Sequence, residues 1–219
     1  MRWGRTTIPV VVALGLTAGC SSGTSLNGEE KKSSTQVVTD ARVALKAAKT
    51  VHVTGTQKGT GEDAGSDFVM DLYYLNGTGG YGSVTVSGKR LDIVRIGNDV
   101  YIKDDSDVTG SAASTGKFQK LSATSGTGKS VGDIANLGSF ADNVITSDKT
   151  LQPGVVKGTT DGAKAVVLTD SDGPAKLYVA NTGSPVPLAI EGPDPSTGKL
   201  TFSDYNKKVE VTAPTNVAS

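Results

Sequence analysis

Hydrophobic and polar residues alternate with a period of two along most of the chain beyond residue 50. In the clearest run, residues 67–75, four large side chains fall on one face: Phe68, Met70, Leu72 and Tyr74. Such alternation is typical of strands with one buried face. Asn-Gly, Asp-Gly and Thr-Gly turn signals separate these runs and leave too little chain for parallel crossovers. The pattern predicts an antiparallel sheet of about ten to eleven strands.

Two segments have the hydrophobic period of a helix instead. The first covers residues 36–50, and the second covers residues 132–145. A stretch rich in glycine and serine, residues 122–130, predicts a loop before the second helix, and residues 208–214 alternate again and predict a final strand. A sheet of this many strands must curl, and the helices must cover one of its faces. The expected fold class is therefore α+β.

The N-terminus has the features of a secretory signal peptide over residues 1–19. Arg2 and Arg5 form a positive region, and residues 8–18 are almost wholly apolar but too short to span a bilayer. The run ends in Thr17-Ala18-Gly19-Cys20, which resembles the lipobox of bacterial lipoprotein precursors. We expect cleavage between Gly19 and Cys20, and a diacylglyceryl group on Cys20 that anchors the protein to the extracytoplasmic face of the cell membrane.

Composition limits what the rest of the chain can be. Residues 20–35 are small, polar and charged, which predicts a lipidated N-terminus and flexible tether before a single domain at 36–219. The 22 basic and 22 acidic residues become 20 and 22 once Arg2 and Arg5 are removed, so the mature net charge is near −2. The sequence has no basic patch that would indicate nucleic acid as a partner. Its lone cysteine cannot form an internal disulfide. We expect a monomer.

Three segments carry a resemblance to a known family. They are the lipobox at Cys20, the phrase ALKAAKTVHVTG at 44–55, and the pair LYVANTGSPVPLAIEG at 177–192 and LTFSDYNKKVEVTAP at 200–214. Together they resemble the LppX/LprG-type lipoproteins of actinobacteria and, more distantly, the LolA/LolB lipoprotein carriers. The resemblance extends over most of the mature chain.

The resemblance implies a strongly curved antiparallel sheet, a half-barrel, with helices over its concave face. It also implies an apolar cavity between sheet and helices, in which family members carry or present acylated lipids or glycolipids across the cell envelope. Candidate lining residues are the large apolar side chains of the predicted strands and second helix: Phe68, Met70, Leu72, Tyr74, Ile93, Ile102, Leu137, Phe140, Leu177, Leu188 and Phe202.

Two alternatives stay open at this point. The same side chains are equally suited to a packed core without a cavity. In that case the protein is a lipid-anchored structural or interaction protein, which binds a cell-wall or membrane protein through an exposed face.

Other patterns offer little support for an enzyme, a cofactor or a metal site. They are a loose P-loop match at 123–130, serine–lysine spacings at Ser114/Lys117 and Ser196/Lys199, the single histidine His52, and acidic runs at 104–107 and 170–172. Ala123 replaces the first glycine of the P-loop, and no second histidine or cysteine pair completes a zinc site. We expect no enzymatic activity.

Overall fold

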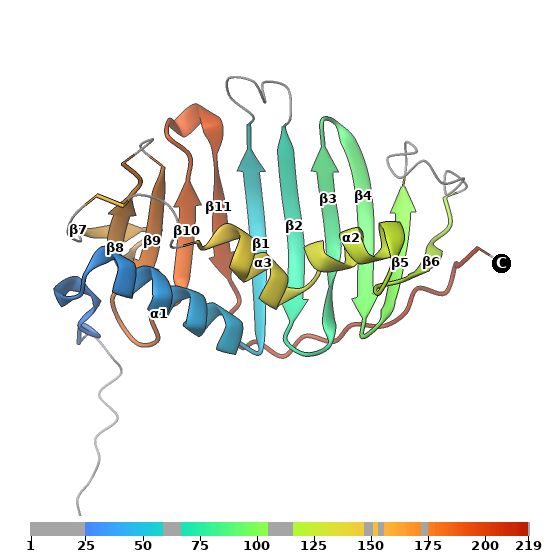
Figure 1. Ribbon diagram of the computed structural model, residues 1–219, viewed down its shortest axis with the longest axis horizontal. Coiled ribbons are helices and arrows are strands. Elements are labelled where there is room, and N and C mark those ends of the chain that lie inside the picture. Colours follow the sequence, from blue (N-terminus) through green and yellow to red (C-terminus); the bar gives the residue numbers. More distant parts are fainter. Residues whose placement is uncertain are drawn as a thin grey trace, which may run out of the picture.

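The computed structural model describes residues 25–58, 67–104, 116–146, 151–152, 156–171 and 175–218. In these residues one open antiparallel sheet of eleven strands curves behind three helices (Figure 1). The strand order is β6-β5-β4-β3-β2-β1-β11-β10-β9-β8-β7. The strands are β1 Thr50–Gln57, β2 Phe68–Leu75, β3 Gly79–Val86, β4 Lys89–Ile96, β5 Asp99–Asp104, β6 Gln119–Ser122, β7 Val156–Thr160, β8 Ala163–Thr169, β9 Lys176–Ala180, β10 Pro187–Glu191 and β11 Gly198–Ser203. The expected α+β class, strand number and antiparallel pairing are confirmed.

Alternation along the strands places apolar side chains on the helix side of the sheet, where they form rows across neighbouring strands. Register aligns Phe202 with Val53, Val53 with Leu72, and Ile93 with Ile102 across neighbouring strands. Four of these five side chains are fully buried, and Phe202 is 4% exposed. These rows form the floor of the hydrophobic core, and the concave face of the sheet is therefore the face that the helices cover.

The first helix, α1, comprises Ser34–Ala47 and covers the β10 side of the sheet (Figure 1). It begins two residues earlier than predicted because Ser33 and Gln36 form a reciprocal capping box. Its buried stripe is Val37, Val38, Ala41 and Leu45. Lys46 joins it to the third helix through an ion pair of 2.5 Å with Asp142.

The predicted second helix is in fact two helices, α2 at Gly126–Ile134 and α3 at Leu137–Val144. Asn136 ends the continuity because its Oδ1 accepts a hydrogen bond from the Ser139 amide and caps α3. The loop predicted at 122–130 is wrong from residue 126 onward. Two glycines of α2 allow close helix–sheet packing: a Cβ on Gly128 would lie 2.2 Å from the Ser122 carbonyl oxygen, and one on Gly132 would lie 3.0 Å from the Val100 side chain.

The described part of the predicted flexible tether is packed on the domain. Leu26 forms a β-bridge with Thr182, and a short 3₁₀ helix follows at Glu29–Lys31. Glu29 is only 1% exposed. Polarity alone suggested a flexible segment, but Asn27 bonds to backbone carbonyls at the turn between β9 and β10, and Glu29 pairs with Lys32. Residues 20–24 lie outside the described residues.

The C-terminal segment crosses the sheet without becoming a strand. It leaves β11, passes the ends of the central strands and ends beside β6 (Figure 1). Val209 and Val211 are half-buried while Glu210 between them is exposed, so alternation is present. The strand predicted at 208–214 is nevertheless wrong, because the segment runs across strands rather than alongside one. Its single β-bridge joins Val217 to Phe118.

Within the described parts of the chain, every helix is too short or too polar to cross a membrane.

Candidate functional site

One end of the concave face is closed by hydrogen bonds between sheet and helices. Tyr74 Oη donates to the Ile134 carbonyl at 3.0 Å, and Arg95 Nη1 donates to the Gly132 carbonyl at 2.7 Å. These carbonyls belong to the last turn of α2, where the carbonyl groups of a helix have no hydrogen-bond partners within the helix. A Cβ on Gly80 would lie 3.0 Å from the Ala135 carbonyl oxygen, so glycine permits the close approach. Burial raises the pKa of Tyr74, which keeps its hydroxyl a donor.

Aromatic packing continues this closed region toward the centre of the sheet. The Phe140 ring of α3 lies 4.9 Å from the ring of Tyr74 and 6.2 Å from that of Phe202, centre to centre. All three side chains are at least nine-tenths buried. The junction between α2 and α3 is therefore fixed to the sheet at this end, which we call the sealed end.

At the opposite end of the strands, helices and sheet separate around an open groove of about 690 Å³. Its floor and walls are largely apolar, and its rim carries amides, hydroxyls and two carboxylates. The lining residues are Gln57, Phe68, Met70, Ser130, Asp133, Ile134, Phe140, Asn143, Val144, Thr146, Ala175, Ile190, Glu191, Gly192, Pro193 and Leu200. A volume of this size falls in the range of about 300–1,000 Å³ that is usual for small-molecule sites.

The groove extends in both directions. Ser130 and Ile134 also line a second hollow of about 410 Å³, which reaches β3 and β4 through Val84, Val86 and Leu91. The two hollows therefore adjoin each other beneath α2, at Ser130 and Ile134.

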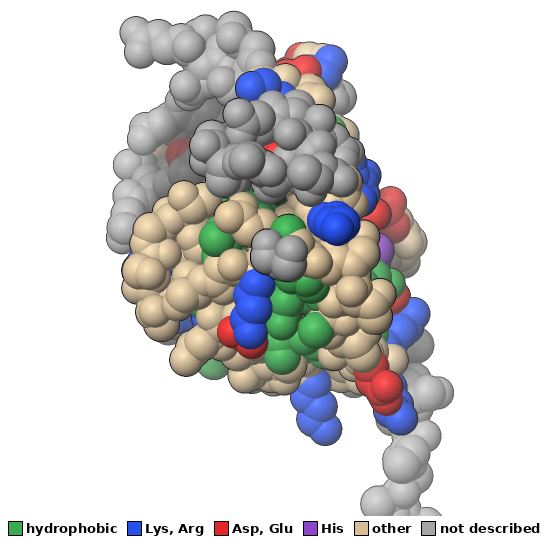
Figure 2. Space-filling model, turned by 90° about the vertical axis from the view of Figure 1, so that its right-hand side faces the viewer, with side chains coloured by type: hydrophobic (Ala, Val, Ile, Leu, Met, Phe, Trp, Pro, Cys, Tyr) green, Lys and Arg blue, Asp and Glu red, His purple; other side chains and the backbone are tan. Residues whose placement is uncertain are grey.

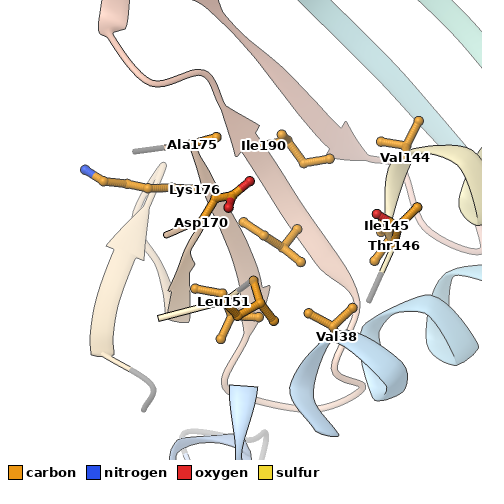
Figure 3. A pocket seen from close by; sticks show the side chains of 11 residues that line it. Val38, Val144, Ile145, Thr146, Leu151, Asp170, Ala175, Lys176 and Ile190 are labelled. Atoms are coloured by element: carbon orange, nitrogen blue, oxygen red, sulfur yellow. The ribbon is translucent and has the colours of Figure 1, made fainter. Parts of the chain in front are cut away.

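On the other side, a small chamber of about 80 Å³ shares four residues with the groove: Val144, Thr146, Ala175 and Ile190. Figure 3 shows Val38 of α1 at one side of this chamber, and Lys176 with its ammonium group directed away from it. The chamber prolongs the groove toward β8 and β9.

Cations accompany both carboxylates at the groove rim. Lys129 Nζ lies 2.7 Å from Asp133 on the surface of α2. Glu191 accepts a hydrogen bond of 2.7 Å from Tyr178 Oη and lies 3.6 Å from Lys199 Nζ. Burial and the bond to Glu191 raise the pKa of Tyr178 to about 12. The rim is thus polar and electrically balanced, which suits a ligand with an apolar body and a polar end.

The structure divides the predicted lining residues into three groups. Phe68, Met70 and Phe140 line the groove, and Leu177 lines the small chamber. Leu188 lies at the irregularity in β10 and is half-buried. The others belong to the packed core, with exposures of 0–4%: Leu72, Tyr74, Ile93, Ile102, Leu137 and Phe202.

Sequence reasoning missed several lining residues. Ile134, Val144, Ile190 and Leu200 line the groove, and all four lie in segments whose apolar pattern was recognised. Which apolar positions remain open depends on where the helices end over the sheet, and that is a tertiary property. A break signal was present in Asn136, a residue that favours helix N-caps.

The other candidate motifs have structural roles in the described residues. The P-loop match forms the start of α2, where Lys129 pairs with Asp133. His52 lies on the convex face of β1, stacked on Tyr73 with ring centres 3.8 Å apart. No group of three or more histidine, cysteine or acidic side chains in the described ranges is arranged to hold a metal. Gly19 and Cys20, the expected cleavage and lipidation site, and Ser114 lie outside the described residues.

The β6 end of the sheet exposes hydrophobic side chains in the middle of a polar surface (Figure 2). This is the end at which the C-terminal segment meets Phe118: the Phe118 amide donates to the Asn216 carbonyl at 2.9 Å, and the Ala218 amide donates to the Phe118 carbonyl at 2.7 Å. The segment thereby covers part of an edge that would otherwise offer free backbone groups.

Comparison with known proteins identifies the fold. No family model and no curated protein matches the sequence. Among solved structures, LprF from Mycobacterium bovis matches with a TM-score of 0.52 at 15% identity, covering 82% of this chain and 96% of that one. LppX from Mycobacterium tuberculosis matches with a TM-score of 0.47 at 14% identity, covering 81% and 97%. A LolA superfamily protein from Nitrosomonas europaea matches with a TM-score of 0.28 at 13% identity, covering 82% and 95%.

The likeness to LprF, together with the curved sheet and the helices over its concave face, confirms at the level of the fold the resemblance seen in the sequence. This chain therefore has the half-barrel α+β fold of the mycobacterial lipoprotein LprF.

Proposed function

We propose that this protein is a cell-envelope lipoprotein that carries or presents an acylated lipid in the groove between its sheet and its helices. The observation that carries the proposal is the open end of the concave face, where a groove of about 690 Å³ is lined largely by apolar side chains. Phe68, Ile134 and Ile190 are only half-buried there, although their neighbours toward the sealed end are fully packed. An acyl chain would complete their burial.

The energetics of an acyl ligand are sufficient. Each buried methylene contributes roughly 0.8 kcal/mol, so ten methylenes supply about 8 kcal/mol before the costs of ordering. The amides and hydroxyls at the rim, on Gln57, Ser130 and Asn143, can hydrogen-bond a polar head group. The ligand would therefore lie with its chains inside the groove and its head at the rim.

The anchor belongs to the same proposal. Cleavage after Gly19 leaves Cys20 at the N-terminus, where a diacylglyceryl thioether supplies two acyl chains to the membrane. The protein then works at the extracytoplasmic face of the membrane, as a carrier rather than an enzyme.

A charge placed in the groove tests the proposal. Ile134→Arg puts a guanidinium where the two larger hollows meet, and Val43→Arg places the same group on α1, where Val43 is 61% exposed. Binding of a dansyl-labelled fatty acid, followed by fluorescence, should weaken at least about tenfold in Ile134→Arg and stay unchanged in Val43→Arg. Equal affinity in both variants would contradict binding in the groove and favour the interaction protein without a ligand cavity.

A further inference from the structure

The segment before α1 is fastened to one end of the domain. Leu26 forms a β-bridge with Thr182 in the turn between β9 and β10. The Asn27 amide donates to the Asn181 carbonyl at 3.1 Å, and Asn27 Nδ2 donates to the Ala180 carbonyl at 2.9 Å. Both the backbone and the side chain of Asn27 therefore bind this segment to the end of β9.

The fastening continues without a gap into α1. Lys32 Nζ lies 2.6 Å from both Glu29 and Asp40, and hydrogen bonds to Asp40 and Glu29 raise its pKa to about 12. Glu29 is 1% exposed, and Ser33 caps the helix that follows. We call residues 26–33 the clamp. Only residues 21–25 then connect Cys20 to the clamp.

The reach of the chain before the clamp is short. Leu26 is six residues beyond Cys20, and six fully extended residues span at most about 20–22 Å. A flexible chain of that length reaches about 13 Å on average. If the chain were free as far as Ser33, thirteen residues would reach at most about 45 Å. The clamp therefore halves the distance over which the domain can move from its anchor.

The groove lies at the other end of the β9–β10 hairpin. Ala175, which lines the groove, precedes Thr182 by seven residues, or about 23 Å of extended strand. The hollow continues from there to β4, six strands away from β9 in the sheet, which adds about 29 Å across the strands. Both distances exceed the greatest reach of the free chain.

We infer that the clamp holds the groove away from the membrane that carries the anchor, with the turn between β9 and β10 facing that membrane. This inference rests on the proposed function for the anchor and the groove. The groove then exchanges its lipid with a lipid surface other than its own membrane. Length and hydrogen bonding of the N-terminal segment thus determine which surface the groove faces.

Energy transfer to the membrane surface tests this orientation. The only tryptophan, Trp3, lies in the expected signal peptide, so the mature chain can carry a single engineered donor. Residues 20–219 are coupled through Cys20 to a maleimide lipid in phosphatidylcholine vesicles that contain a dansyl-headgroup lipid. Ser184→Trp places a donor in the exposed β9–β10 turn, and Ser196→Trp places one at the exposed connection between β10 and β11, beside the groove rim. We expect several-fold more efficient transfer from Ser184→Trp.

A longer tether is the decisive control. Fifteen glycine and serine residues inserted before Ser25 raise the average reach to roughly 25 Å, so the difference between the two donors should largely disappear. The same insert placed after Ser219 should leave the difference intact. If either tryptophan prevents folding, the exposed pair Thr35→Trp and Lys89→Trp replaces it.

Equal transfer from both donors in the uninserted chain, or stronger transfer from the rim, would overturn the inference. The readout is the distance of each tryptophan from the membrane surface, and it requires no ligand in the groove. Its outcome is therefore independent of whether the groove binds lipid, which the fatty-acid experiment decides separately.

Discussion

The two ends of the concave face are built from similar residues but differ in how the helices meet them. At the sealed end, Tyr74 and Arg95 bond the carbonyls of α2, and Gly80 lets the helix junction approach the strands. At the open end, Phe68 and Ile190 face the groove instead of a helix. The difference shows that polar anchors at one end of a helical cover can leave apolar surface available for a ligand at the other.

Ile134 connects the two regions. Its carbonyl accepts the Tyr74 hydrogen bond at the sealed end, while its side chain lines both larger hollows. Changes at the sealed end should therefore mainly affect stability, and changes at the open end should mainly affect binding.

The largest contrast is expected from truncation of one β-branched residue at each end. Ile93→Ala removes a fully buried side chain from the packed rows and should lower the free energy of unfolding by about 2–5 kcal/mol. Val86→Ala alters a side chain that lines the hollow and is 43% exposed, so the change should stay within about 0.5 kcal/mol. Urea denaturation measures both. Similar losses would mean that the open end is as tightly packed as the sealed end.

A smaller effect is expected from the hydrogen bond that fixes α2. Tyr74→Phe keeps the ring but leaves the Ile134 carbonyl without this donor, which should cost about 1–3 kcal/mol. Tyr81→Phe, on the convex face, should cost less than about 0.5 kcal/mol. Denaturation of the two variants side by side compares them. Equal losses of stability in the two variants would mean that the Tyr74 hydrogen bond does not hold α2 to the sheet.

The smallest effect concerns acid. Asp204, next to the sealed end, has its pKa held below the ordinary 3.8 by hydrogen bonds from Lys207 and Tyr73. Its stabilising contribution is present above pH 3.8 and is lost as pH falls through the lower folded pKa. Hydrogen exchange of the Asn206 amide, which donates to the Thr50 carbonyl, should accelerate below pH 3.8 relative to other amides. In Asp204→Asn this acceleration of exchange below pH 3.8 should be absent. If the acceleration persists in the variant, another titrating group causes it.

The sheet could be predicted because its information is local. Alternation in residues 67–75, followed by Asn76 and Gly77, specifies a strand and a turn, and the structure has β2 and a turn with Gly77 at φ 74°. The same logic fails for residues 208–214. Alternation there indicates that one face of the segment is covered, but it does not show that another strand lies alongside. Strand pairing depends on the path of the chain, which no local pattern contains.

The helices and the groove were less predictable. Glycines 126 and 128 suggested a loop by their intrinsic propensity, yet both lie in α2, where Gly128 packs closely against Ser122 of β6. Phe68 and Leu72 are both apolar and lie on the same face of β2. Because of where α2 lies, Phe68 lines the groove and Leu72 is buried in the core. Composition likewise could not show that Asn27 bonds to β9 or that Lys32 pairs with Asp40 of α1.

The central claim is that the groove holds an acylated lipid, and mass spectrometry tests it most directly. Residues 21–219, without the anchor, are purified from a bacterial host and measured intact under native conditions, and bound material is extracted with solvent. We predict an additional mass that resolves into acyl lipids or glycolipids. A single apo mass that persists after incubation with total envelope lipid would contradict the claim.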